Sequence, residues 1–158
     1  MTFERARPDD PDVLALFDPF IREADGPLEV AIDIEAEIAA GPPADLAPPN
    51  GVLLLARVNG APAGLGGVRH LDTEVAEVKS MFVAPSFRGS GLARRLLGEL
   101  EGIAVGRGCR AIRLDTSAYL TAAVALYRAA GYREVPRYNA NLKADLWFER
   151  SLAAEPQL

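Results

Sequence analysis

The residues best suited to chemistry form a glycine-rich run, Arg88-Gly89-Ser90-Gly91, which follows an apolar segment and precedes an amphipathic one. Glycines have no Cβ, so the backbone N–H groups of such a run can converge on one point. A helix that begins here adds unpaired N–H donors and about half a positive charge at its N-terminus. The run therefore predicts an anion site, and a diphosphate is its natural occupant.

Two common phosphate-binding motifs fit this run poorly. A Walker A loop would continue as Gly-Lys-Ser/Thr, which is absent here. A dinucleotide fingerprint has a different glycine spacing, and the strands before the run are expected to be antiparallel. A glycine-rich turn that binds no ligand remains an alternative. So does a nucleotide-phosphate binder, although neither a carboxylate for Mg²⁺ nor a phosphate-contacting lysine is evident near the run.

Glu77 is the first candidate for a proton acceptor. In a regular strand, Val75, Glu77, Lys79, Met81 and Val83 alternate onto one face. A carboxylate among apolar neighbours accepts a proton more readily near neutrality. An ion pair with Lys79, or an ordinary exposed strand position, explains Glu77 equally well.

Turn residues and hydrophobic periodicity indicate the elements that position these groups. Asn59-Gly60 predicts a β-hairpin turn. We expect strands over 2–7, 52–58, 62–71, 74–83, 111–115, 132–135 and 145–152, and helices over 11–24, 32–40, 88–105 and 121–130. Antiparallel strands followed by a strand–helix–strand crossover imply a mixed sheet with helices on its faces. The fold class is therefore α/β (α+β), with a mostly antiparallel sheet of about six to seven strands, about four helices and a single domain over 1–158.

Caps and breakers mark the expected helix ends. Asp9 or Asp10 can cap the first helix, and Gly26-Pro27 stops it. Thr121 is the expected N-cap of the last helix, which Gly131 closes.

The segment 83–93 resembles the coenzyme A motif of the GNAT-type N-acetyltransferase superfamily. That motif reads Gln/Arg-x-x-Gly-x-Gly/Ala, and Arg88, Gly91 and Ala93 fill its three positions. In the family, the backbone amides of this motif hold the pyrophosphate of the coenzyme. The resemblance extends over nearly the whole chain, because the expected element order is that of the acyl-CoA N-acyltransferase (GNAT) fold.

A second family signature follows at the family's spacing, as Ala123-x-x-Leu126-Tyr127-x-x-x-Gly131-Tyr132. Two departures stand out. Many members carry Asn where this chain has Leu120, which removes one expected contact with the coenzyme. Tyr132 replaces the commoner Phe.

The resemblance implies direct transfer of the acetyl group of acetyl-CoA to a primary amine, of a small molecule or a peptide, in a ternary complex and with no metal. The implied coenzyme-binding residues are Met81, Phe82, Val83, Arg88, Gly89, Ser90, Gly91, Leu92 and Ala93. Tyr127 resembles the tyrosine that protonates the departing thiolate, although a core aromatic is the alternative. Glu77 lies where some members place their glutamate base, whereas others remove the proton through an ordered water.

The composition limits the kinds of partner that we expect the protein to bind. The formal net charge is −5, which disfavours nucleic acid and mildly favours a cationic acceptor. We find neither a signal peptide nor an apolar run long enough to span a membrane, so we expect a cytoplasmic protein that does not bind membranes. The fold is compatible with a homodimer. A coenzyme A-binding module without catalysis and an enzyme for longer acyl-CoA remain alternatives.

The remaining reactive and aromatic residues have plainer interpretations. Cys109 cannot form an internal disulfide and is expected to be a buried strand residue. A covalent route through Cys109 would need a base, and His70 belongs to a different strand. Tyr138 and Asn139 follow the last helix and could wall the acceptor site. Trp147 and Phe148 are expected to pack in the closing strand, and His70 to lie near the substrate.

Overall fold

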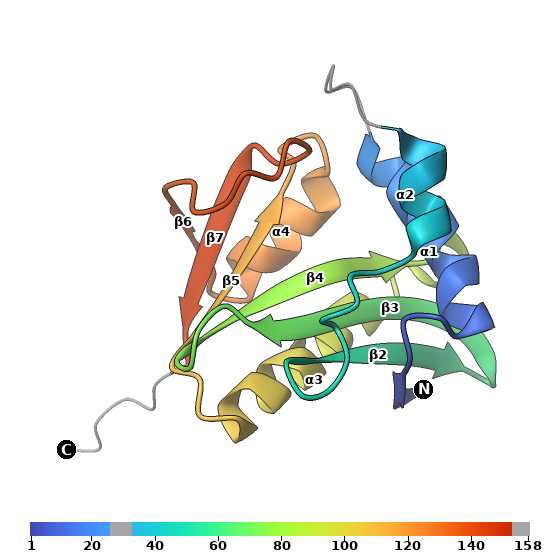
Figure 1. Cartoon of the computed structure of the whole chain (residues 1–158), viewed down its shortest axis with the longest axis horizontal. Helices are drawn as coiled ribbons and strands as arrows, with labels where there is room; N and C mark the ends of the chain where they lie inside the picture. The colour runs from blue at the N-terminus through green and yellow to red at the C-terminus, as the bar shows by residue number, and fades with distance from the viewer. Residues whose placement is uncertain (26–32, 153–158) are drawn as a thin grey trace.

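Seven strands form one mixed sheet in the computed structural model, which describes residues 1–25 and 33–152 (Figure 1). The strand order is β1-β2-β3-β4-β5-β7-β6. The strands are β1 (Thr2–Ala6), β2 (Gly51–Val58), β3 (Ala61–His70), β4 (Val75–Val83), β5 (Ala111–Thr116), β6 (Arg133–Val135) and β7 (Leu146–Ser151). The α-helices of this part are α1 (Pro11–Asp25), α2 (Ile34–Ala40), α3 (Leu92–Gly106) and α4 (Thr121–Ala129).

The strand pairing confirms the predicted mixed sheet. Only β4 and β5 pair in parallel, and every other neighbouring pair is antiparallel. The predicted hairpin joins β2 to β3, where Asn59 and Gly60 have φ values of 50° and 82°. These positive angles match the turn type that lets two twisted strands meet through two residues.

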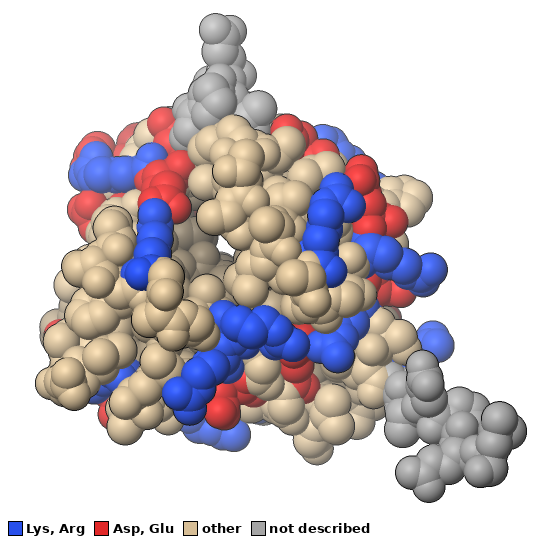
Figure 2. Space-filling view, turned by 180° about the vertical axis from the view of Figure 1, so that it is seen from behind, with Lys and Arg blue, Asp and Glu red and all other residues tan. Residues whose placement is uncertain are grey.

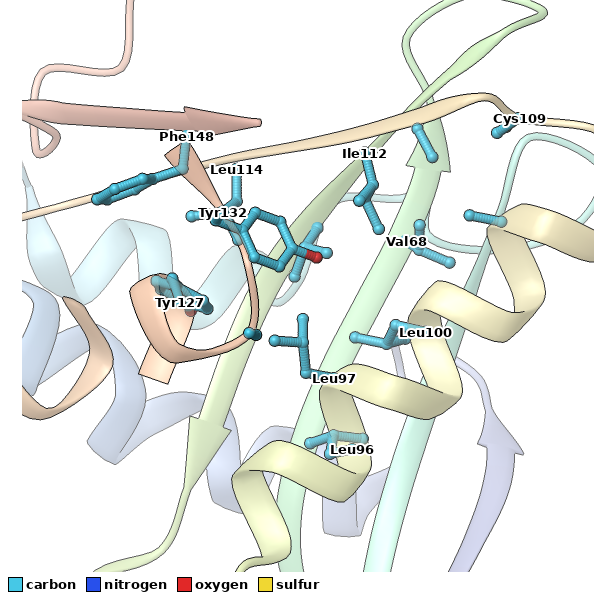
Figure 3. Packing of buried hydrophobic residues seen from close by; sticks show 14 of the residues in the cluster. Val68, Leu96, Leu97, Leu100, Cys109, Ile112, Leu114, Tyr127, Tyr132 and Phe148 are labelled. Carbon is cyan, nitrogen blue, oxygen red and sulfur yellow. The ribbon is translucent and has the colours of Figure 1, made fainter. Parts of the chain in front are cut away.

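The helices cover both faces of the sheet. Helix α3 places Leu96, Leu97 and Leu100 against sheet residues such as Val68 and Ile112, and this cluster is shown in Figure 3. On the opposite face, α1 packs its own buried residues against Leu53, Leu55, Leu65 and Phe82. The sheet is therefore buried on both sides along its centre, as the apolar run of β2 predicts.

Helix α3 begins at Leu92, so the expectation that it starts at Arg88 is wrong. Pro85–Phe87 forms a 3₁₀ turn instead, and Gly89 and Gly91 both have φ of +80°. A left-handed residue cannot continue a right-handed helix, so the glycines form a separate loop before α3. The expectation for Thr121 is also wrong. Leu120 occupies the N-cap of α4, and no side chain caps this helix.

A β-bulge interrupts β4 and changes which residues share a face. Leu65 pairs with Phe82 and Gly67 with Lys79, so Ser80 and Met81 both lie opposite Gly66. Ser80 has φ of +57°. The simple alternation from 75 to 83 is therefore wrong beyond Lys79, and Met81 packs on the α3 face.

Smaller differences concern the ends of elements. Asp10, of the two proposed caps, accepts a hydrogen bond from the Asp12 N–H at 2.9 Å. Asp33 caps α2, while the predicted stop at Gly26-Pro27 and the residue Ile32 lie outside the described residues. Cys109 is buried but precedes β5 rather than belonging to it. No helix in the described parts of the chain is long and apolar enough to cross a membrane.

Candidate active site

A cavity of about 850 Å³ lies where β4 and β5 separate. The two strands pair in parallel only from Val75 and Ala111 to Glu77 and Arg113, and beyond this point they diverge (Figure 1). The surface in Figure 2 is hollowed near its centre, in the region between α1 and α4. One part of the cavity is lined by the glycine loop, and the other by polar side chains of the sheet and of the loop 136–145.

The glycine loop brings residues with unpaired backbone N–H groups to the cavity wall. Within 1–25 and 33–152, we find no acceptor for the N–H groups of residues 89–94, and the first bond of α3 runs from the Arg95 N–H to the Gly91 carbonyl. An added Cβ at Gly89 or Gly91 would meet nothing within 4 Å, so lack of space is not the reason for glycine at these positions. The reason is the positive φ, which glycine adopts without strain. The geometry is that of an anion site at a helix N-terminus.

The side chain of Arg88 fastens this loop to the rest of the molecule. Its Nε donates to the Val83 carbonyl at 2.9 Å, and its Nη2 lies 2.7 Å from Glu23 Oε2. The guanidinium also stacks over the ring of Phe82, 5.5 Å from the centroid. In this conformation Arg88 therefore positions the loop against β4 and α1.

The predicted coenzyme residues come together, with one exception. Met81, Phe82, Val83, Arg88, Gly89, Gly91, Leu92 and Ala93 all line the cavity. Ser90 does not, and its hydroxyl donates to the Phe87 carbonyl at 2.7 Å. Leu120 also lines the cavity, at the position where many members of the family in the resemblance carry Asn.

Tyr127 lies on α4 and lines the cavity, although only 5% of the residue is exposed. Its ring packs against Tyr132, with 5.9 Å between centroids, and against Phe148 (Figure 3). Burial, and secondarily the charge of Asp115, raises the pKa of Tyr127 above its ordinary value. The phenol therefore stays protonated at neutral pH, where it can donate a proton or a hydrogen bond.

Glu77 is 1% exposed and does not line the cavity. Its Oε1 accepts from Arg69 Nη2 at 2.9 Å, and its Oε2 accepts from the Tyr138 hydroxyl at 2.7 Å and from Asn139 Nδ2 at 3.3 Å. The surroundings of Glu77 are therefore polar, and the expectation of apolar neighbours is wrong. The charge of Arg69 compensates the buried carboxylate.

Lys79 stands between Glu77 and the cavity. Its Nζ lies 2.7 Å from Asp115 Oδ2 and 3.9 Å from Glu77 Oε1. Tyr138 and Asn139, which the sequence placed near the acceptor, do not line the cavity but hold this buried network from behind. Trp147 Nε1 donates to Asn139 Oδ1 at 2.9 Å and fixes that amide.

Sequence reasoning missed several cavity residues, namely Glu37, Arg69, Asp115, Asn141 and Lys143. One signal was available in the loop before β7. Asn139, Asn141 and Lys143 are polar residues at a spacing of two, a pattern that indicates an extended segment with one polar side. The structure has a turn at residues 142–143 instead, so the pattern marks the polar residues but not their conformation.

Cys109 and His70 lie together but away from this cavity. Cys109 Sγ is 3.6 Å from His70 Nδ1, and neither residue lines the cavity. Burial raises the pKa of the Cys109 thiol. The covalent route through Cys109 is therefore excluded by position, and His70 is not at the substrate end. The described residues contain no group of His, Cys, Asp and Glu side chains that could hold a metal ion.

Comparisons with known proteins agree with this geometry. The model of the Acetyltransferase (GNAT) family matches residues 12–132. An IAA acetyltransferase of Azospirillum brasilense is 41% identical over 91 residues, which are 56% of this chain and 59% of that protein, so the match spans about three fifths of its length. The N-alpha-acetyltransferase RimI of Mycobacterium tuberculosis is 32% identical over 78% of this chain and 85% of its own. An acetyltransferase of Streptococcus agalactiae superposes with a TM-score of 0.77 at 18% identity, over 95% of this chain and 97% of that one, a likeness that shows the fold.

Proposed function

The chain belongs to the acetyltransferase (GNAT) family, and from this premise we propose that it transfers the acetyl group of acetyl-CoA to a primary amine in a ternary complex. The observation that carries the proposal is a single cavity in which the unpaired N–H groups of the glycine loop, the open edge of β4 and a polar wall all meet. The similarity to an N-alpha-acetyltransferase over most of both chains supports an amine acceptor.

The residues present fit acetyl-CoA. The N–H groups of 89–93 suit its diphosphate, because they combine convergent backbone donors with the positive end of α3. Among the strands of residues 1–25 and 33–152, none pairs with the β4 edge beyond Glu77 on the β5 side, so its backbone groups can pair with the amides of an extended chain. When bound, acetyl-CoA supplies an activated acetyl thioester. Backbone N–H groups of Met81 to Val83 are the donors that we propose for its carbonyl oxygen.

Tyr127 is the acid in this proposal. It is the tyrosine of the second motif, it lines the cavity, and its phenol is protonated at neutral pH. The hydroxyls of Tyr132 and Tyr138 donate to carboxylates, whereas we find no hydrogen bond of the Tyr127 hydroxyl among the described residues, so this hydroxyl is free to turn toward a sulfur atom. We therefore assign it the proton, or the hydrogen bond, that the departing thiolate requires.

Glu77 assists proton removal in this proposal without being the base itself. Its carboxylate is buried behind Lys79, so a direct contact with an amine in the cavity would need Lys79 to move. We infer that an ordered water accepts the proton from the amine and that Glu77, through the network of Lys79 and Asp115, stabilises the positive charge that results.

Two alternatives concern the same site. A coenzyme A-binding module without catalysis would keep the glycine loop, and an enzyme for a longer acyl chain would need room beyond the thioester. An assay of the purified protein with acetyl-CoA and a panel of primary amines distinguishes these two alternatives from the proposed transfer. We expect release of free thiol together with products heavier by one acetyl group. Bound acetyl-CoA with no thiol release for any amine would support the inactive module. Faster release from longer acyl-CoA would support the other alternative.

A further inference from the structure

The half of the cavity away from the glycine loop is rich in cations. Arg69, Lys79 and Lys143 line it, from β3, β4 and the loop before β7. Two carboxylates line the same half, Glu37 from α2 and Asp115 from β5. The acceptor must bind in this half, because the other half belongs to the coenzyme in the proposed function. The hydrogen bonds of these groups decide which charge the acceptor can bring.

Asp115 has little accepting capacity left. Its Oδ2 accepts from Lys79 Nζ at 2.7 Å and from Asn139 Nδ2 at 2.6 Å, and its Oδ1 accepts from Asn141 Nδ2 at 2.9 Å. A carboxylate offers about four lone-pair positions, so three strong donors occupy most of them. Asp115 thus serves mainly to hold the wall together, and it offers little to an additional cation.

The lysines, by contrast, keep unused donors. Each ammonium has three N–H groups. Lys79 donates one hydrogen bond, to Asp115. The Lys143 side chain is 11% exposed, and its Nζ forms an ion pair with Glu37 Oε2 at 2.7 Å. Among the described residues, its other N–H groups have no hydrogen-bond partner. A buried ammonium with unsatisfied donors favours a further anionic partner.

We propose that the acceptor amine carries a carboxylate, as a free amino acid does, and that Lys143 binds this carboxylate with help from Lys79. This inference rests on the proposed function, since it names the substrate class of the same site. Arg69 is paired with Asp45 and Glu77, so it offers little to a ligand. The unused donors of Lys143 and Lys79, not an excess of positive charge, are what would hold a carboxylate here.

Binding to the protein saturated with coenzyme A tests the proposal without requiring turnover. The probes are free L-amino acids and the matching amino acid amides, which differ only in the carboxylate, titrated by calorimetry at pH 7. We expect the free acids to bind at least about tenfold more tightly, because charge-assisted hydrogen bonds are roughly twice as strong as neutral ones. Lys143→Met should remove this preference, and Lys143→Arg, which keeps the charge, should restore most of it.

Arg110→Met is the matched control. It also removes one positive charge, but Arg110 is exposed just before β5, where it pairs with Glu74. The preference should survive in this variant. Equal or tighter binding of the amides, or a preference that persists in Lys143→Met, would overturn the proposal. Acetyl transfer to the same panel is measured separately: transfer without a carboxylate preference overturns this inference alone, and a preference without transfer overturns the proposed function alone.

Discussion

At the scale of residues, two tyrosines of the same cluster allow chemistry and packing to be separated. Tyr127 lines the cavity, whereas the Tyr132 hydroxyl donates to Glu101 at 2.8 Å inside the core. We expect Tyr127→Phe to lower kcat on the order of a hundredfold, since it removes the proposed acid, and to leave the KM for acetyl-CoA nearly unchanged. Tyr132→Phe should instead lower the free energy of unfolding by about 1–3 kcal/mol and leave kcat unchanged. Equal kcat values in the two variants would contradict the assignment.

The role of the Glu77 charge can be tested by comparing a variant of Glu77 with a variant of a residue that hydrogen-bonds to it. Glu77→Gln removes the carboxylate charge, and Tyr138→Phe removes one hydrogen bond to the same carboxylate. If the charge assists proton removal, Glu77→Gln lowers kcat by about a hundredfold and Tyr138→Phe by much less. Steady-state rates at saturating acetyl-CoA measure both. Similar losses in the two variants would mean that Glu77 acts only by holding the wall in place.

The sequence identified the types of these residues better than their surroundings. Tyr127 and the glycine loop belong to local motifs, so their place followed from a few neighbouring residues. The partners of Glu77 come from β3 and from the loop after β6, and they are 8 to 62 residues away along the chain. No local pattern could predict Arg69, Tyr138 and Asn139 around one carboxylate. The hydroxyl of Tyr132, in place of the commoner Phe, is explained by Glu101, which is equally remote.

At the scale of elements, hydrophobic periodicity predicted the order of strands and helices. The exceptions arise where residues adopt a positive φ that periodicity does not reveal. The helical pattern continues through Arg88, but positive φ at Gly89 and Gly91 delays α3 until Leu92. The bulge at Ser80 likewise has no signature in a nine-residue strand that otherwise alternates. Both exceptions lie on the cavity wall, and both leave backbone groups outside regular pairing, which is what a site for an extended ligand requires.

Two glycines give opposite predictions for stability. Gly102 is inside α3, and an added Cβ would meet nothing within 4 Å, so Gly102→Ala should raise the free energy of unfolding by about 0.5–1 kcal/mol. Gly67 lies in β3, where a Cβ would come within 2.7 Å of the Leu46 side chain. Gly67→Ala should lower stability by about 1–3 kcal/mol. Urea denaturation measures both, and effects of the same sign would contradict the packing described here.

At the scale of the whole molecule, all four tyrosines share one property. Burial is the largest cause that raises the pKa of each, and nearby carboxylates add to it. The folded protein therefore keeps these protons above pH 10, where an unfolded tyrosine releases them. Stability should be unaffected below about pH 9.5 and should fall as the pH rises further, because unfolding then releases protons.

Tyr127, Tyr132 and Tyr138 each contribute a slope of up to about 1.4 kcal/mol per pH unit above pH 10, and the more exposed Tyr119 contributes less. Urea denaturation between pH 8 and pH 11, with phenolate absorbance as a second signal, measures the effect. Tyr132→Phe should reduce the slope of the unfolding free energy against pH by the contribution of one tyrosine. Reversible titration of all tyrosines near pH 10 with no loss of stability would contradict the burial of Tyr127 and Tyr132.

The net charge of the molecule and the charges of the cavity lead to different expectations for the acceptor. A value of −5 mildly favours a cationic acceptor, whereas our proposal assigns Lys79 and Lys143 of the cavity to a carboxylate of the acceptor. Acidic side chains elsewhere pair with arginines on the surface, as Glu35 does with Arg22, and such pairs do not reach the site. Total charge acts over long distances and is screened by salt, whereas a binding site responds to the groups in contact.

The central claim is that acetyl-CoA binds with its diphosphate on the glycine loop, and calorimetric titration tests it most directly. Gly91→Asp places a negative charge at the start of α3, and Gly60→Asp makes the same substitution at a positive φ of +82° in the β2–β3 turn. We predict that the unmodified protein and Gly60→Asp bind acetyl-CoA with similar affinity, and that Gly91→Asp weakens binding by at least about a hundredfold. Unchanged binding in Gly91→Asp, or no binding by the unmodified protein at millimolar acetyl-CoA, would contradict the claim.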